Sequence, residues 1–196
     1  MMHPVKKANK VLVLVRHVQS LLNAGETDFH DCDVSKKGQS QIDGLAMSLK
    51  LHLGHNWLNK PFRGFVSPFL RTLRTAVPIQ KLGIPFVVDH RIAEAPDEAY
   101  KKLKLSEVVS RHEDFAQYDW KLFPVNGVSQ EERVMQSYYA GLEHFLKTLP
   151  EYAIVVTHMS PVQDLVARIS GKTNGMIGNA SITLIEDGKL VFCGRT

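Results

Sequence analysis

Cysteine is scarce in this sequence, and long apolar runs are absent. Cys32 and Cys193 are the only cysteines among 196 residues, and they form no CxxC pair. A disulfide scaffold is therefore not expected, and we predict a reducing, cytoplasmic location. Arg16 interrupts the apolar run at residues 11–15, which is too short for a secretion signal or a membrane span. We expect no membrane association.

Strong charge of one sign is also missing. The chain has 24 Lys and Arg against 20 Asp and Glu, a formal net charge of +4, and no basic run is longer than two residues. This weak positive balance argues against a nucleic-acid partner but suits a small anionic substrate. The contents of 44% hydrophobic and 22% charged residues are those of an ordinary globular protein.

Short aliphatic runs alternate with patterns of helical periodicity along the chain. Helical spacing is expected around residues 42–53, 135–146 and 162–169, and the continuous apolar runs are typical of strands buried on both faces. The strands are expected at 11–15, 62–67, 85–89, 152–157, 181–186 and 189–193. Asp187-Gly188 separates the last two runs and predicts a hairpin.

These patterns predict an α/β fold, a three-layer sandwich. Its mostly parallel central sheet would carry helices on both faces and an antiparallel C-terminal edge hairpin. We expect residues 1–196 to form a single domain, because the length suits one core and no repeat is apparent. Residues 90–127 are the least regular part, and we interpret them as an excursion over the active-site end of the sheet.

Two Ser-Pro pairs each stand between a predicted strand and a predicted helix. We expect Ser67 and Ser160 to be helix N-caps, with Pro68 and Pro161 at the first helical positions. Ligands of open α/β sheets bind at the carboxyl ends of the strands, where helix N-termini attract anions.

Histidine and arginine follow three of these strands. Arg16 and His17 end the first, Arg71 follows the strand that ends near Ser67, and His158 follows residues 152–157. Arginine matches phosphate oxygens in a bidentate fork, and neutral imidazole is a nucleophile towards phosphorus. Neighbouring arginines would keep such an imidazole neutral. The pattern favours phosphoryl chemistry.

Five segments resemble the histidine phosphatase superfamily, the phosphoglycerate mutase-like enzymes, in the order in which that family carries them. RHVQSLLNAG (16–25) is similar to its RHG region, and VSPFLRTLRTA (66–76) to its Ser-Pro-Leu-x-Arg segment. The others are DVSKKGQSQIDGLA (33–46), VVTHMSPV (155–162) and GNASITLIEDGKLV (178–191). The resemblance covers nearly the whole chain and implies the same fold.

The resemblance also implies roles for individual residues. His17 would be the nucleophile that forms a phosphohistidine, and Arg16, Arg71 and His158 would complete the phosphate pocket. Asn23 and Ser67 would be further substrate-binding residues.

The proton donor of the family lies in a stretch that corresponds to RIAEAPDEAY (91–100). Glu94 aligns best there, with Asp97 and Glu98 as alternatives. The chemistry of the family needs no metal and no cofactor.

The sequence departs from the family pattern at three positions. Val18 replaces the motif glycine, Gln19 replaces the glutamate after it, and Met159 stands where glycine often follows the second histidine. If either former glycine position required a positive φ, Val18 or Met159 would strain the backbone. Both side chains are also expected to narrow the pocket.

Other chemically suggestive residues have ordinary explanations. HDCD (30–33) and HLGH (52–55) lack zinc spacing and are expected to be loop and helix-end residues. Arg74 is expected to be solvated or salt-bridged. The lysines at 101, 102 and 104 are most simply a solvated face.

We therefore expect a phosphomonoester hydrolase, a metal-independent phosphatase of the histidine acid phosphatase type, that acts on a small phosphate ester. A mutase is the alternative within the same chemistry, less favoured because such mutases usually carry longer insertions. A catalytically weak, phosphate-binding member is the other alternative. The sequence leaves the substrate and the oligomeric state open, although Trp57, Leu58 and Phe62 could support a homodimer.

Overall fold

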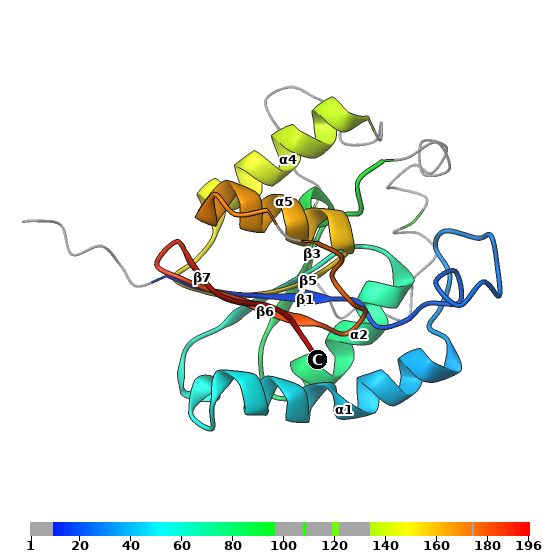
Figure 1. Ribbon diagram of the computed structural model, residues 1–196, viewed down its shortest axis with the longest axis horizontal. Helices are drawn as coiled ribbons and strands as arrows, with labels where there is room; N and C mark the ends of the chain where they lie inside the picture. The colour runs from blue at the N-terminus through cyan, green and yellow to red at the C-terminus, as the bar shows by residue number, and fades with distance from the viewer. Residues whose placement is uncertain (1–9, 97–107, 109–118, 122–133, 174) are drawn as a thin grey trace, which may run out of the picture.

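The computed structural model describes residues 10–96, 108, 119–121, 134–173 and 175–196 (Figure 1). Its centre is a seven-stranded sheet with the strand order β4-β3-β2-β5-β1-β6-β7. The strands are β1 (Val11–Arg16), β2 (Arg63–Val66), β3 (Phe86–Asp89), β4 (Asp119–Lys121), β5 (Tyr152–Thr157), β6 (Ile182–Glu186) and β7 (Lys189–Arg195).

The sheet is parallel except at one edge. The strands from β4 through β3, β2 and β5 to β1 pair in parallel, whereas β6 runs antiparallel to β1, and β7 antiparallel to β6. Asp187 and Gly188 connect β6 to β7 with φ values of 51° and 78°. Two successive positive φ angles are typical of the tight hairpin turn. The predicted mostly parallel sheet and its antiparallel C-terminal edge are thus confirmed.

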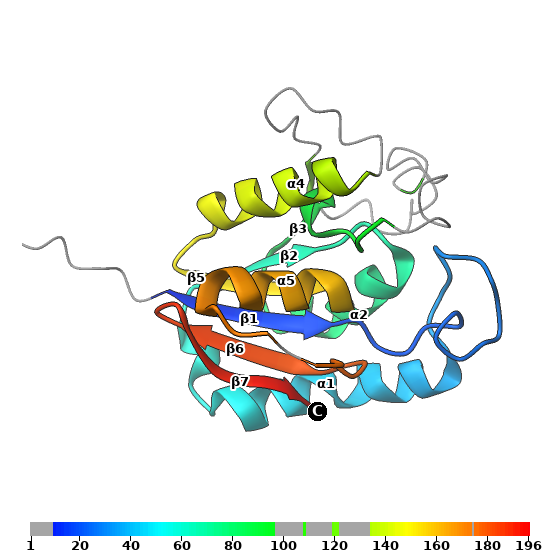
Figure 2. The same cartoon turned by 45° about the horizontal axis from the view of Figure 1, so that its top comes forward.

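Helices cover both faces of the sheet and complete three layers. α1 (Lys36–Leu53) and α2 (Leu70–Gln80) lie on one face, and α4 (Met135–Thr148) and α5 (Met159–Ser170) lie on the other (Figures 1 and 2). Two short 3-10 helices, Trp57–Asn59 (η1) and His90–Ile92 (η2), accompany them. The observed architecture is the predicted α/β sandwich.

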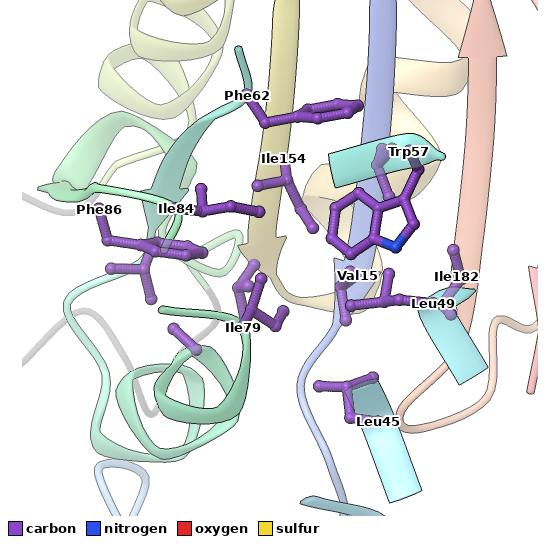
Figure 3. Packing of buried hydrophobic residues seen from close by; sticks show 14 of the residues in the cluster. Val15, Leu45, Leu49, Trp57, Phe62, Ile79, Ile84, Phe86, Ile154 and Ile182 are labelled. Carbon is purple, nitrogen blue, oxygen red and sulfur yellow. The ribbon is translucent and has the colours of Figure 1, made fainter. Parts of the chain in front are cut away.

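The apolar run of β1 is buried on both sides. Val13 and Val15 belong to the core cluster shared with α1 and α2, and Figure 3 shows Val15 within it. Leu12 and Leu14 belong to the cluster shared with α4 and α5. Side chains of a strand alternate between the faces of the sheet, so a strand with helices on both faces must be apolar at every position. At Arg16 the strand leaves this core.

The predicted start of α2 was wrong. Ser67 is not the N-cap, because α2 begins at Leu70 and Phe69 precedes it. Instead, the Leu70 backbone N–H donates to Oδ1 of Asp31 across 2.8 Å. A carboxylate from a distant segment thus satisfies a first-turn N–H that Ser67 was expected to satisfy.

The predicted start of α5 was also wrong. The helix begins at Met159 and His158 occupies the N-cap position with an extended backbone, so Ser160 and Pro161 lie inside the first turn. A proline is tolerated there, because first-turn N–H groups have no partner within the helix. The second histidine therefore stands directly at the start of a helix.

Most of the predicted excursion at 90–127 lies outside the described residues, as do Asp97, Glu98 and the lysines at 101, 102 and 104. The short strand β4 falls in this range and was not predicted. The single-domain boundary and the position of the excursion stay predictions. In the described part of the chain, no helix is long and apolar enough to cross a bilayer.

Candidate active site

A cavity of about 340 Å³ opens at the carboxyl ends of the parallel strands. It collects side chains from segments far apart in the sequence, including most of those expected to bind or transfer phosphate. Its lining residues are Arg16, His17, Leu22, Asn23, His30, Arg71, Glu94, Ala95, Pro96, Met159 and Ser160. The two predicted residues outside this lining, Ser67 and His158, contact each other beside it.

His17 follows the last residue of β1 and is 2% exposed. Its backbone N–H donates to the Thr157 carbonyl, which ties it to the end of β5. Nδ1 lies 2.7 Å from the Val18 carbonyl oxygen. A carbonyl can only accept a hydrogen bond, so Nδ1 carries the proton and Nε2 keeps its lone pair. Burial, followed by the charge of Arg71, lowers the pKa of His17 well below its usual value, and Arg16 lowers it further.

Arg71 connects both histidines. The side chain is 2% exposed, its Nε lies 3.3 Å from Nε2 of His17, and its guanidinium lies 3.2 Å from Nδ1 of His158. It also donates to the carbonyl of His30 and stacks on the ring of Phe69, 4.8 Å from the ring centre. The position in the first turn of α2 was predicted, and it aims the guanidinium at the cavity.

His158 is fully buried at the end of β5. Arg71 donates to its Nδ1, so the ring proton sits on Nε2, which lies 2.7 Å from Oγ of Ser67. The ring also meets Phe69 edge-to-face, with the ring centres 5.2 Å apart. Ser67 therefore orients the second histidine, and it is not among the residues that line the cavity.

Arg16 is the last residue of β1 and also lines the cavity. Its guanidinium donates to the carbonyl of Ile177, while its buried Nε has no hydrogen-bond partner among the described residues. Burial lowers the pKa of Arg16, the charge of Glu94 raises it, and that of Arg71 lowers it. A buried donor without a partner is costly unless an acceptor reaches it, so this atom suits an anionic ligand.

Glu94 is fixed at the start of α5. Its Oε1 accepts from the backbone N–H groups of Ala95, at 3.0 Å, and Ser160, at 3.3 Å. The positive end of a helix favours a carboxylate at this position. Of the three predicted acids, Glu94 is the one in the described part of the chain, and it lines the cavity.

The positions of Val18 and Met159 need no glycine. Neither has a positive φ, so the expected backbone strain does not arise. Val18 is fully buried, and its N–H donates to Oγ1 of Thr75. Both side chains were expected to narrow the cavity, and of the two, Met159 is among the residues that line it and Val18 is not. Gln19 faces α1 instead, where its Oε1 accepts from Ser35.

Several residues of the site were missed in the sequence. Asp31 holds the start of α2, and the carbonyl of His30 accepts from Arg71. Both belong to the stretch 30–33, which lacks zinc spacing and was expected to be an ordinary loop. Nothing in this stretch of sequence indicated contacts with α2. Asn179 donates to the carbonyl of His17 and to Oδ1 of Asn23. It lies in the segment matched to the family, so the resemblance could have identified it.

Arg74 forms a salt bridge with Asp33 at 3.2 Å, as expected. Within the described residues, no group of three or more His, Cys, Asp or Glu side chains is arranged to hold a metal ion. The metal independence expected for this chemistry stays a prediction.

Known proteins share this sequence pattern and fold. A profile of the histidine phosphatase superfamily (branch 1) matches residues 12–189. No match was found among curated protein sequences.

Solved structures cover almost the whole chain. A mycobacterial glucosyl-3-phosphoglycerate phosphatase is 17% identical, with a TM-score of 0.65, and the match covers 96% of this chain and 100% of that one. The same phosphatase with VO3 is 19% identical, with a TM-score of 0.62 and coverages of 95% and 100%. An Escherichia coli protein, to which alpha-ribazole-5'-P phosphatase activity is attributed, is 14% identical, with a TM-score of 0.63 and coverages of 95% and 96%. At these identities the structures show a common fold.

Proposed function

Because the chain belongs to branch 1 of the histidine phosphatase superfamily, we propose that it hydrolyses phosphate monoesters through a phosphohistidine formed on His17. The observation that carries the proposal is the fixed protonation of this ring. The Val18 carbonyl holds the proton on Nδ1, so the lone pair of Nε2 lies among the guanidinium groups of the cavity.

The electrostatics of the site support a neutral nucleophile. Burial and the charges of Arg71 and Arg16 lower the pKa of His17, so the ring is neutral at neutral pH and carries only the proton on Nδ1. The same two guanidinium groups attract the phosphoryl group of a substrate and match its oxygens. The cations that would bind the phosphate thus also keep the nucleophile reactive.

In the first chemical step, Nε2 of His17 attacks phosphorus. The N–P bond forms while the bond from phosphorus to the ester oxygen breaks, and Glu94 gives a proton to the leaving oxygen. Arg16 and Arg71 stabilise the charge on the transferring group, as preorganised donors do. His158, oriented by Ser67, is the second imidazole near the group.

In the second step, water replaces the histidine. The carboxylate of Glu94 takes a proton from the water, the new O–P bond forms, and the N–P bond breaks. Inorganic phosphate and the starting protein result. One carboxyl group thus acts as acid and then as base. Its contacts with the backbone N–H groups of Ala95 and Ser160 hold it in place for both steps.

The proposed substrate is a small phosphate ester. One structural relative is a mycobacterial glucosyl-3-phosphoglycerate phosphatase, and a second structure of that phosphatase contains VO3. A cavity of about 340 Å³ suits a phosphorylated metabolite of moderate size. Hydrolysis without a metal, a cytoplasmic location and a homodimer remain expectations from the sequence.

A phosphate-binding member with little turnover is the second candidate. Val18 and Met159 motivate it, because glycine is usual at both positions of the family. The ordinary backbone at both residues removes strain as a reason for inactivity.

A mutase is the remaining alternative, because transfer of the phosphoryl group from His17 to a second alcohol in place of water would make the protein a mutase.

The test is hydrolysis of para-nitrophenyl phosphate in the presence of a chelator, followed by mass spectrometry after an alkaline quench, because the N–P bond of a phosphohistidine is stable in alkali and is lost in acid. We expect turnover by the wild type, an adduct on His17, and loss of both in His17→Ala. The control is His55→Ala, because His55 lines a different pocket. Full activity of His17→Ala, or strict dependence on a metal, would contradict the mechanism.

Two further measurements, of phosphate binding and of transfer to an added alcohol, distinguish the phosphate-binding protein and the mutase from the hydrolase. Binding of inorganic phosphate without turnover of any ester would favour the phosphate-binding candidate. Transfer of the phosphoryl group to an added alcohol in preference to water would favour the mutase.

A further inference from the structure

Asn179 makes two contacts that converge on the candidate active site. The residue is half-buried between α5 and β6. Its Nδ2 lies 3.2 Å from the carbonyl oxygen of His17 and 3.1 Å from Oδ1 of Asn23. One amide nitrogen therefore contacts the main chain of the nucleophile and the side chain of a predicted phosphate ligand.

The partners fix the orientation of the Asn179 amide. The carbonyl of His17 can only accept, so the atom that faces it must be the NH2 group. Nδ2 of Asn179 donates one proton to the carbonyl of His17 and the other to Oδ1 of Asn23. A flipped amide would place oxygen against oxygen at both contacts.

The same reasoning fixes Asn23. Its Oδ1 faces the backbone N–H of Ser20 at 3.4 Å and Nδ2 of Asn179 at 3.1 Å, and both of these groups are donors. The backbone N–H of Asn23 donates in return to Oγ of Ser20. With Oδ1 held on this side, Nδ2 of Asn23 donates to no described acceptor, and Asn23 lines the cavity. Because both groups that face Oδ1 are donors, the NH2 group of this exposed side chain is the part of the amide left available to an acceptor.

The backbone next to Asn179 is held by the same carbonyl. The N–H of Ala180 donates to the His17 oxygen at 3.1 Å. Ala180 has a φ of 59°, a conformation that alanine rarely adopts and that persists only where the surroundings impose it. The turn presents the Asn179 side chain and the next N–H to one oxygen.

We propose that Asn179 is a positioning residue of the phosphate site, which turns the NH2 group of Asn23 towards the phosphoryl oxygens through its contact with Oδ1 of Asn23. This inference rests on the proposed function for its catalytic consequence. Its structural part, the orientation of Asn23 towards a bound oxyanion, can be tested by binding alone.

The test is a double-mutant cycle of Asn179→Ala and Asn23→Ala. Its readouts are kcat/KM for para-nitrophenyl phosphate and the affinity for orthovanadate, the probe of the oxyanion site. Asn23→Ala removes one hydrogen bond to a charged group, so we expect a loss of about 10- to 100-fold. Asn179→Ala leaves the amide of Asn23 free to rotate, and we expect a loss of about threefold to tenfold. The double variant should match Asn23→Ala within about twofold, because the N–H of Ala180 still donates to the His17 carbonyl in Asn179→Ala and the remaining effect acts through the amide of Asn23.

Two further variants separate orientation from loop stability. Gln163→Ala removes the 2.9 Å contact to the carbonyl of Gly175 and loosens the same loop without touching Asn23. We expect it to stay within about twofold of the wild type, as surface changes away from a site usually do. Asn179→Leu has nearly the same shape, carries no charge and cannot donate, so it should lower orthovanadate affinity about as much as Asn179→Ala.

The outcomes discriminate between the two proposals. Equal losses from Asn179→Ala in both backgrounds, or the same loss from Gln163→Ala, would overturn the positioning role. If the wild type binds orthovanadate but hydrolyses no ester, the proposed function fails while the cycle in affinity still decides the role of Asn179. A wild type that neither binds nor hydrolyses contradicts both.

Discussion

Nε of Arg71 donates to Nε2 of His17 across 3.3 Å, and this contact joins the expected phosphate ligand to the expected nucleophile. The hydrogen bond occupies the lone pair that would attack phosphorus, and a nearby positive charge disfavours its protonation. Under the proposed mechanism, substrate binding would exchange the contact for one between Arg71 and a phosphoryl oxygen. Arg71 would then both keep the His17 ring neutral and bind the substrate.

The first prediction concerns the shape of this cation. Arg71→Lys keeps the charge but loses the planar fork that reaches His17, His158 and the carbonyl of His30. We expect kcat/KM for para-nitrophenyl phosphate to fall on the order of 100-fold, because lysine does not replace a bidentate guanidinium. Arg74→Lys is the matched control one turn later, where a half-exposed pair with Asp33 should contribute little. Similar losses in the two variants would contradict the assignment.

The second prediction concerns acid stability. Burial and the charge of Arg71 hold the pKa of His17 well below 6.5 in the folded protein, whereas in the unfolded chain it is near 6.5. As the pH falls below 6.5, His17 binds a proton in the unfolded chain but not in the folded protein, which favours unfolding. The contribution of His17 to the free energy of unfolding is therefore fully present above pH 6.5 and is lost on acidification. The loss is up to about 1.4 kcal/mol per pH unit until the folded pKa is reached.

The comparison with His17→Gln isolates this effect. Urea unfolding of both proteins at about pH 7.5 and about pH 5.5 should show a larger fall in the free energy of unfolding for the wild type. Parallel changes in the two proteins would mean that the His17 ring is protonated as easily when folded as when unfolded.

The third prediction concerns Val18. The side chain is fully buried and its backbone has no positive φ, so the glycine usual in the family would bring no relief of strain. Val18→Gly should lower the free energy of unfolding by about 3 kcal/mol, through lost burial and added chain entropy. Thermal unfolding measures this loss. A more active Val18→Gly protein would instead show that the valine obstructs the site.

The fourth prediction compares two glycines of α1. A Cβ on Gly38 would lie 2.0 Å from the carbonyl oxygen of Gln19, a backbone atom two residues after the nucleophile. We expect Gly38→Ala to destabilise the protein by about 3 kcal/mol or more and to lower activity, because the segment that follows β1 and contains His17 must move. Gly44→Ala meets no atom within 4 Å and should stabilise the helix by up to about 1 kcal/mol. Unfolding curves of both variants measure the contrast.

Periodicity predicted the layers of this fold from particular residues. The apolar run of β1 needs helices on both faces because Leu12 and Val13 point in opposite directions, and both are buried. Asp187-Gly188 predicted the hairpin because both residues accept positive φ angles. Local chemistry and local periodicity are properties of neighbouring residues, so a sequence displays them directly.

The predicted starts of α2 and α5 were wrong because they depend on contacts between distant segments. Ser67 is a good N-cap by composition, but its hydroxyl is engaged with His158, and Asp31 satisfies the helix N–H in its place. Asp31 is separated from Leu70 by 39 positions. Such a substitution of partners depends on which segments meet in space, and local propensity does not contain this information.

The sequence by itself determined the sandwich, the family pattern and the residue types that phosphoryl transfer needs. Only the tertiary structure decided which ring nitrogen of His17 carries the proton, which way the amide of Asn23 faces, and that Val18 is unstrained. Protonation and orientation follow from the partner of each polar atom. The adjacent Val18 carbonyl faces Nδ1 of His17, but Arg71 at Nε2 and Asn179 at the amide of Asn23 come from distant segments. The fold brings them together because the carboxyl ends of its parallel strands share one edge of the sheet.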